Sequence, residues 1–222
     1  MDIAIAVYPE YTSLDAMGPY QVLQHLPDAT VSFVAAERGL LGDDNGALQI
    51  QIDRSFDETP SPDIIVVPGG TITRLIAHPG QTLVEWIRAV HPTTTWTTSV
   101  CTGSLALGAA GLLDGLDATT HWSAYETLAG FGATPTEQRV VRQGKIMTAA
   151  GVSSGIDMAL TLVGEIAGAD VAEAIQLAIE YDPQPPFDSG SPTKARPEIL
   201  ELVQAISAEG EAALRARYAE QA

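Results

Sequence analysis

Short apolar segments rich in β-branched residues alternate along the chain with segments of helical spacing. The helical spacing is clearest in residues 79–91, where apolar residues recur every three or four positions. Nearly continuous hydrophobic strands are typical of a parallel sheet that is covered on both faces. We therefore predict a doubly wound α/β fold, with a mostly parallel sheet flanked by helices. The predicted strands cover residues 3–8, 31–36, 63–70 and 94–100, and the helix face carries Leu83, Trp86, Ile87 and Val90.

The second half of the chain changes from strands to helices. Residues 139–150 predict a short hairpin that turns at Gln143 and Gly144 and returns the chain to the sheet. Residues 182–194 hold four prolines, and we expect an exposed loop there that is a lid, a dimer contact or a linker. The length of 222 residues suits a single domain over residues 1–222. The predicted helices cover residues 154–168, 169–181 and 195–221.

Charge and composition narrow the class of protein. The formal net charge of -17 repels phosphate backbones and anionic membranes, so we expect no nucleic acid partner and no membrane partner. No apolar segment reaches the roughly 18 residues that a membrane-spanning helix needs. A single cysteine cannot form an internal disulfide, and the N-terminus begins with a strand pattern instead of a basic targeting segment. We therefore expect a cytoplasmic protein.

The one cysteine, Cys101, stands where a β-branched segment gives way to one rich in glycine, alanine and leucine. It is either a small buried hydrophobic residue or a nucleophile. Its position favours the nucleophile, because ligands collect where parallel strands end and helices begin. The N-H groups at the start of the helix stabilise a thiolate there, and Thr102 adds a hydroxyl beside it.

Two further segments carry candidate chemistry. Asp15 follows two residues that can cap a helix, Thr12 and Ser13, and the chain is predicted to restart as a helix at Pro19. By position alone, Asp15 complements a helix dipole or serves a site. Metal ligands at suitable spacing and phosphate-binding loops are both missing from the sequence, so we expect no metal and no cofactor. Gly69 and Gly70 form either a tight turn or a pair of N-H donors.

Four motifs together resemble the ThiJ/PfpI superfamily, within the class I glutamine amidotransferase-like, flavodoxin-like fold. They are AVYPEYTSLDAMGPYQVL, DIIVVPGG, SVCTGSLALGAAGLLDGLDATTHW and AAGVSSGIDMALTLV, and they lie within residues 5–163, a region that makes up most of the chain. The loop YDPQPPFDSGSP at residues 181–192 is similar to that of the isonitrile hydratase subgroup. The resemblance implies a homodimer with Cys101 as the nucleophile and Asp15 as its acidic partner. It also implies that Gly69 and Gly70 form the oxyanion-type donor loop, with Gly70 as the main donor.

The resemblance implies hydration of a small isonitrile to an N-substituted formamide. Cys101 attacks the isonitrile carbon, and Asp15 first gives a proton and then takes one. Thr102 and the N-H of Gly70 are expected to stabilise the changing charge. His121 is a candidate for contact with the site, because superfamily members with a Cys-His pair draw the histidine from this region. The expected apolar lining consists of Trp122, Ile156 and Phe187.

Other functions remain open at this point. One is glyoxalase-like or deglycase-like chemistry on reactive carbonyls. A second is a non-enzymatic oxidation sensor that uses Cys101. A third is the sensor half of an AraC-type regulator, against which stand the acidic charge and the lack of a helix-turn-helix in this sequence. Thr102 departs from the protease-like pattern, in which a histidine follows the cysteine, and argues against peptide hydrolysis.

Overall fold

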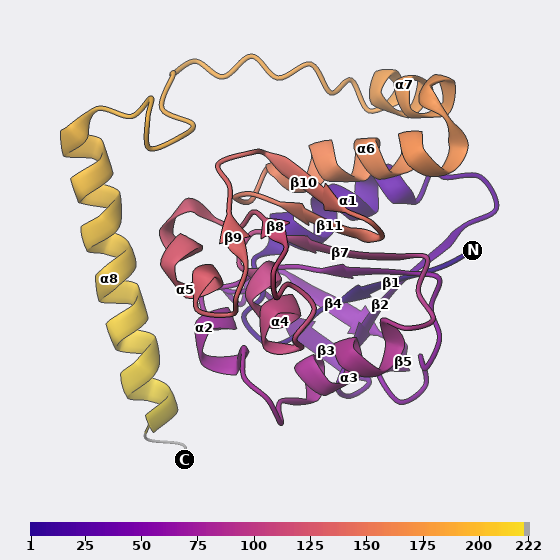
Figure 1. Cartoon of the computed structure of the whole chain (residues 1–222), viewed down its shortest axis with the longest axis horizontal. Helices are drawn as coiled ribbons and strands as arrows, with labels where there is room; N and C mark the ends of the chain where they lie inside the picture. The colour runs from indigo at the N-terminus through magenta and orange to yellow at the C-terminus, as the bar shows by residue number, and fades with distance from the viewer. Residues whose placement is uncertain (220–222) are drawn as a thin grey trace. The chain divides into compact units, whose positions relative to one another are not determined.

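A seven-stranded sheet with the order β10-β11-β7-β6-β1-β2-β5 forms the centre of residues 1–180 (Figure 1). All neighbouring strands are parallel except β10, which pairs antiparallel with β11 at one edge. The strands of the sheet are β1 (Asp2–Ala6), β2 (Thr30–Ala35), β5 (Arg54–Ser55), β6 (Ile64–Val67), β7 (Trp96–Val100), β10 (Val140–Gln143) and β11 (Ile146–Ala149). The prediction of a mostly parallel α/β sheet is therefore confirmed.

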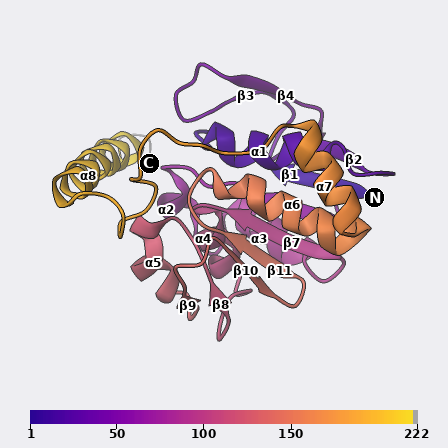
Figure 2. The same cartoon turned by 90° about the horizontal axis from the view of Figure 1, so that it is seen from above.

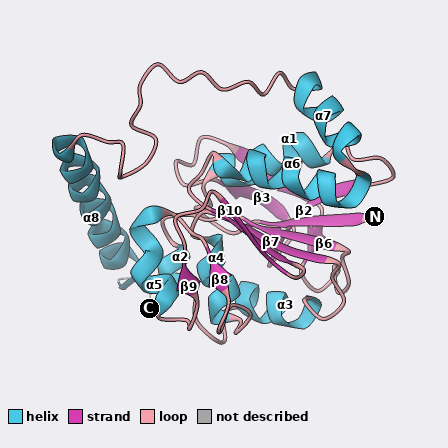
Figure 3. Cartoon of the chain, turned by 45° about the horizontal axis from the view of Figure 1, so that its top comes forward, coloured by secondary structure: helices cyan, strands magenta, loops and turns pink. Residues whose placement is uncertain are grey.

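Helices cover both faces of this sheet, as the alternation of strands and helices predicts (Figures 2 and 3). The helices α1 and α6 pack together on one face, and α3 and α4 contact each other on the other face. The helices are α1 (Ser13–Leu23), α2 (Thr73–Ile76), α3 (Thr82–Val90), α4 (Gly103–Ala109), η1 (Trp122–Ala124), α5 (Tyr125–Ala129), α6 (Ser154–Ala167) and α7 (Ala169–Ala178). Two small pairs complete the unit, β3 (Gly39–Gly42) with β4 (Gln49–Ile52) and β8 (Asp117–Ala118) with β9 (Thr134–Pro135).

The core lies between the sheet and the two helical layers. All four residues of β6 and all five of β7 are buried, as expected for strands covered on both faces. The strand β6 is entirely apolar, whereas β7 also buries the hydroxyl groups of Thr97, Thr98 and Ser99. The predicted helix face is buried too, which confirms the helical spacing of residues 79–91. That face consists of Leu83, Trp86, Ile87 and Val90.

Two local predictions are wrong in detail. Pro19 does not start a helix but lies inside α1, where it leaves the carbonyl of Asp15 without its helical N-H donor. Close packing against α6 accounts for this, because a Cβ added at Gly155 would stand 3.2 Å from the Pro19 ring. The hairpin turns one residue later than predicted, because Gln143 already pairs with Ile146 and Gly144 supplies the positive φ of 59°.

The computed structural model describes residues 1–219, which divide into two compact units at residue 180. The second unit holds the proline-rich segment, which has neither helix nor strand, and α8 (Pro197–Ala219). The single domain over residues 1–222 stays a prediction, and the predicted end of the last helix beyond Ala219 lies outside the described residues. Within residues 1–219, no helix combines the length and hydropathy required to cross a membrane.

Candidate active site

The turn between β7 and α4 holds its first residue in a strained conformation. Cys101 follows the last residue of β7 and has a φ of 57°, which is unfavourable for any residue other than glycine. Its N-H donates to the carbonyls of Ala149 and Ala150 at 3.1 and 2.9 Å, and its carbonyl accepts from the Thr120 hydroxyl at 3.0 Å. These bonds hold the backbone in place, so the sulfur is fixed at the carboxyl edge of the sheet.

The sulfur of Cys101 lies in a nearly closed environment, with the residue only 6% exposed. Burial raises the pKa of the thiol well above its ordinary range, and the negative charge of Asp15 raises it further. The N-H groups of Thr102 and Val152 donate to the sulfur and lower the pKa in part. These two N-H groups are therefore the donors positioned to stabilise a thiolate.

Val152 was not among the residues predicted from the sequence. It follows β11, and β11 runs parallel to β7, so the loop after β11 arrives at the same edge of the sheet as Cys101. A backbone donor has no side-chain signature. The usable signal was the order of the strands together with the small residues of the segment AAGVSSG.

Asp15 is fully buried on α1 and has two distinct carboxyl oxygens. Its Oδ2 accepts the N-H of Gly69 at 2.9 Å, whereas its Oδ1 has no partner in ordinary hydrogen-bond geometry among residues 1–219. Burial raises the pKa of Asp15 from 3.8 to about 7, the Gly69 N-H and the Cys101 thiol lower it, and the charge of Asp44 raises it. An anchored carboxyl group with one open oxygen near Cys101 can exchange a proton.

Asp15 and Cys101 act as one titrating pair. Both pKa values are raised mainly by burial, and each group influences the other. Two adjacent anions in a medium of low dielectric are costly, so the pair keeps one proton near neutral pH. The proton can lie on the carboxyl group or on the sulfur, which is the property that acid and base catalysis requires.

Thr102 and the glycine loop are joined by a buried hydroxyl network. The N-H of Gly70 donates to the Thr102 hydroxyl at 3.0 Å, and that hydroxyl lies 3.0 Å from the Thr73 hydroxyl. Thr73 donates to the carbonyl of Gly70 at 2.7 Å, and Tyr8 donates to the carbonyl of Pro68 at 2.7 Å. The N-H of Gly70 therefore already has an acceptor in Thr102, and its predicted role as the main oxyanion donor stays a prediction. Both residues serve to hold the loop.

Gly69 cannot be replaced without disturbing the pair. A Cβ at this position would lie 2.6 Å from both the N and the Oγ1 of Thr102, and 2.8 Å from Oδ2 of Asp15. Its own N-H anchors the Asp15 carboxyl group, so this donor is also occupied. The glycine pair therefore positions Asp15 and the turn at Cys101 and Thr102, because its backbone can approach both closely.

His121, another predicted site residue, belongs to a different hydrogen-bonded group. His121 caps η1, its Nδ1 lies 2.8 Å from the Ser123 hydroxyl, and burial and the charge of Arg74 lower its pKa. Its ring lies against Gly151, in the loop that carries Val152, and a Cβ added there would be 3.0 Å from Cδ2. Within residues 1–219, no hydrogen bond joins His121 to Cys101 or Asp15.

The expected apolar lining is only partly located. The Trp122 ring lies 5.2 Å from that of His121, and Ile156 packs on α1 at Gly18, where an added Cβ would be 3.1 Å from its Cγ1. Both residues are partly buried beside the loops that carry the pair. Phe187 belongs to the second unit and is 79% exposed, so its predicted part in the lining stays a prediction. Within residues 1–219, no group of three His, Cys, Asp or Glu side chains is placed to hold a metal.

Comparisons with known proteins identify a family and similar sequences. The model of the DJ-1/PfpI family matches residues 1–165. Isonitrile hydratase from Pseudomonas putida is 43% identical over 201 residues, which cover 90% of this chain and 87% of that protein. The transcriptional regulator GbdR from Pseudomonas aeruginosa is 34% identical over 141 residues, which cover 61% of this chain and 37% of the regulator.

Two solved structures extend the comparison. A ThiJ/PfpI family protein from Pseudomonas syringae superposes with a TM-score of 0.87 at 40% identity, over 95% of this chain and 89% of that one. DJ-1 from Schizosaccharomyces pombe has a TM-score of 0.69 at 19% identity, over 82% of this chain and 100% of that one, and supports the fold alone.

Proposed function

This chain belongs to the DJ-1/PfpI family, and we propose that it is an isonitrile hydratase, which converts an isonitrile R-N≡C to the formamide R-NH-CHO. The observation that carries the proposal is the buried Cys101 thiol on its strained turn beside the buried Asp15 carboxyl group, each of which influences the pKa of the other. The identity of 43% to isonitrile hydratase from Pseudomonas putida supports it. The reaction needs a nucleophile for carbon and a group that first gives a proton and then takes one.

The first step forms a carbon-sulfur bond. The sulfur of Cys101 attacks the terminal carbon of the isonitrile, and the proton of the pair passes from Asp15 to the same carbon. The product is a thioimidate, R-N=CH-S-Cys101, with Asp15 ionised. A pKa of about 7 suits Asp15 to this task, because the acid gives up its proton readily and its conjugate base can accept one near neutral pH.

The second step adds water to the thioimidate. The Asp15 carboxylate takes a proton from water as the oxygen bonds to carbon, and passes that proton to nitrogen. The tetrahedral species then loses its hydroxyl proton to Asp15 as the carbon-sulfur bond breaks, which releases R-NH-CHO and restores the pair. The N-H groups of Thr102 and Val152 stabilise the departing thiolate.

Thr102 and Gly70 support this chemistry by position. Their mutual hydrogen bond fixes the loop that carries Gly69, and Gly69 in turn anchors Asp15. The proposal also includes a homodimer and a cytoplasmic location, both expected from the sequence. Sedimentation of the purified protein tests the dimer, which a monomer would contradict, and cell fractionation tests the location.

The test is detection of formamide from a small panel of isonitriles, with methylglyoxal as the competing substrate. We expect turnover of cyclohexyl isocyanide without lactate from methylglyoxal. The Cys101→Ala variant should be folded and inactive, and Asp15→Asn should lose about 10²-fold to 10⁴-fold in rate. Asp53→Asn, an exposed carboxylate outside the site, is the matched control and should keep full activity. Full activity of Cys101→Ala would end the proposal.

An oxidation sensor is not favoured by the same site. Sensor cysteines are accessible and have a lowered pKa, whereas Cys101 is buried and its pKa is raised. Titration with peroxide and intact-mass measurement would separate the two functions. Rapid stoichiometric gain of two oxygens without turnover of any isonitrile would favour the sensor.

A further inference from the structure

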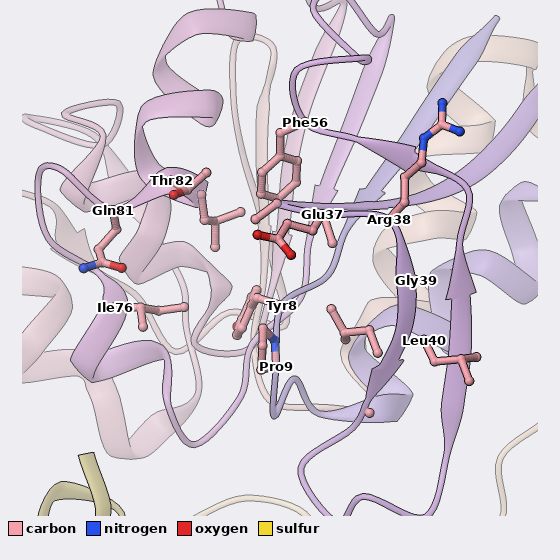
Figure 4. A pocket seen from close by; sticks show the side chains of 15 residues that line it. Tyr8, Pro9, Glu37, Arg38, Gly39, Leu40, Phe56, Ile76, Gln81 and Thr82 are labelled. Atoms are coloured by element: carbon pink, nitrogen blue, oxygen red, sulfur yellow. The ribbon is translucent and has the colours of Figure 1, made fainter. Parts of the chain in front are cut away.

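A cavity of about 540 Å³ lies at the carboxyl edge of the sheet (Figure 4). The hydroxyl of its lining residue Tyr8 lies 2.8 Å from the Thr73 hydroxyl, which connects the wall of the cavity to the network around Thr102. It is enclosed by the ends of β1 and β2, by β3, by α2 and by the start of α3. Neither Cys101 nor Asp15 is among its lining residues. Its volume falls within the range of about 300 to 1,000 Å³ that is usual for small-molecule sites. The chemistry of its wall therefore indicates what it can bind.

One part of the wall is apolar and buried. Ala35, Phe56 and Leu83 are each at most 5% exposed, so they form a rigid surface. Phe56 is held further by stacking on Trp86, with ring centroids 4.6 Å apart. A preformed apolar wall favours a ligand with a hydrocarbon body, because little ordering is lost on binding.

An exposed carboxylate, that of Glu37, borders this apolar part of the wall. Figure 4 shows the carboxylate of Glu37 directed into the cavity, while the guanidinium of Arg38 points away from it. Arg38 is already paired with Glu58 through two hydrogen bonds. Within residues 1–219, the Glu37 carboxylate has no hydrogen bond and no ion pair. The cavity therefore presents an uncompensated negative charge beside apolar side chains.

We propose that this cavity binds a small primary ammonium with a hydrocarbon body. The ammonium pairs with Glu37, and the polar side chains of Gln81 and Thr82 on the opposite wall are acceptors for its remaining protons. The hydrocarbon body covers Phe56 and Leu83. Anions are excluded by the carboxylate and by the net charge of -17. Neither Cys101 nor Asp15 takes part in this binding.

The test is titration of the full chain with cyclohexylammonium chloride, followed by backbone amide NMR and calorimetry. Cyclohexylmethanol is the neutral probe of similar shape. We expect saturable binding of the ammonium, with shifts at Gly39 and Leu83, and affinity at least tenfold above that of the alcohol. Glu37→Gln should weaken ammonium binding about tenfold, or about 1.4 kcal/mol, because the charge-assisted pair is lost.

Asp53→Asn removes a nearby exposed carboxylate that does not line the cavity, and should change the affinity less than twofold. Glu37→Gln should keep wild-type isonitrile turnover, which shows that the variant is folded. If Glu37→Gln and Asp53→Asn weakened ammonium binding equally, the loss of affinity would follow from the change in net charge and not from contact with Glu37. That result would overturn the proposal. Equal affinity for the alcohol, or shifts confined to residues around Cys101, would also overturn it. So would affinity that falls as protein concentration rises, because a second copy would then cover the cavity.

Discussion

Asp15→Asn should stabilise the folded protein at alkaline pH while it removes activity. The substitution replaces a buried carboxyl group by a neutral amide of the same shape, and the amide oxygen can still accept the N-H of Gly69. What disappears is the cost of a buried negative charge. Lower activity together with higher stability in Asp15→Asn would indicate that the buried carboxyl group serves the reaction and not the fold.

The size of the effect follows from the pKa. Folding raises the pKa of Asp15 from 3.8 to about 7, and each pKa unit corresponds to about 1.4 kcal/mol. Because the folded value is the higher one, the stability contributed by this proton is complete below pH 3.8 and is lost as pH rises through about 7. The full loss is about 4 kcal/mol, of which about 2 kcal/mol falls between about pH 5.5 and pH 8.5.

Urea unfolding at about pH 5.5, 7 and 8.5 measures this loss. The lower limit keeps the protein above its isoelectric point near 4.3. The free energy of unfolding of Asp15→Asn minus that of the wild type should rise by about 2 kcal/mol across this range. Constant effects of the substitution, such as a weaker bond to Gly69, cancel in the comparison between pH values. Asp53→Asn supplies the pH dependence that follows from removal of a carboxylate at an exposed position.

A change of less than about 0.5 kcal/mol across the range would refute the reasoning, because a carboxyl group with a strongly raised pKa must contribute a slope of about 1.4 kcal/mol per pH unit below that pKa. A change of opposite sign would mean that the carboxylate is stabilised in the folded state. The Asp15 carboxylate would then be too weak a base to take the thiol proton of Cys101 and to pass it to carbon in the first step. Either result would leave the acid role without a residue.

Three further outcomes follow from the same site. The value of kcat/KM for isonitrile hydration should rise with pH through an apparent pKa of about 7 and then level off. When the Cys101 thiol and the Asp15 carboxyl group both carry a proton, no base is left to take the thiol proton and attack is blocked. Initial rates between pH 5.5 and 9 check this, and a flat profile would contradict it. Gly69→Ala should lower kcat about 100-fold, since its Cβ would lie 2.6 Å from Thr102 and displace the pair; activity within threefold of wild type would show that the close approach is unimportant. Thr102→Val should lower the free energy of unfolding in urea by about 1 to 3 kcal/mol and should also lower kcat, because the buried N-H of Gly70 loses its acceptor. Thr102→Ser keeps the hydroxyl and should have nearly wild-type stability and kcat. Equal defects in the two variants would mean that the hydroxyl has no such role.

The fold was predictable because its strands are buried on both faces. The segment at residues 63–70 is largely apolar without alternation, and the segment at residues 94–100 is rich in β-branched residues. Two such segments separated by an amphipathic helix are typical of a covered parallel sheet. The elbow was predictable for a related reason, since Cys101 follows directly on the second segment. Pro19 shows the limit of such reasoning. It lies inside α1 and packs against Gly155 of α6, and no local signal carries a contact between helices that are far apart in the sequence.

The site was predictable in its side chains and not in its backbone donors. Cys101 and Asp15 were identified by residue type and by family resemblance. The N-H of Val152 and the mutual bond of Gly70 and Thr102 depend on loop positions of a few tenths of an ångström. The same holds for the Glu37 cavity, because an exposed glutamate after a strand has nothing in the sequence to distinguish it from a solvated one.

The two carboxyl oxygens of Asp15 have different roles in the proposed reaction. A carboxyl group that moves a proton between carbon, water and nitrogen must stay in one place through every step, and Oδ2 is fixed by the N-H of Gly69. It must also leave one oxygen open to the reacting atoms, and Oδ1 is that oxygen among the described residues. Burial then sets the pKa near 7, so neither protonation state is favoured strongly over the other. A histidine partner is not required, because the raised pKa gives a carboxyl group the proton affinity for which enzymes often use imidazole.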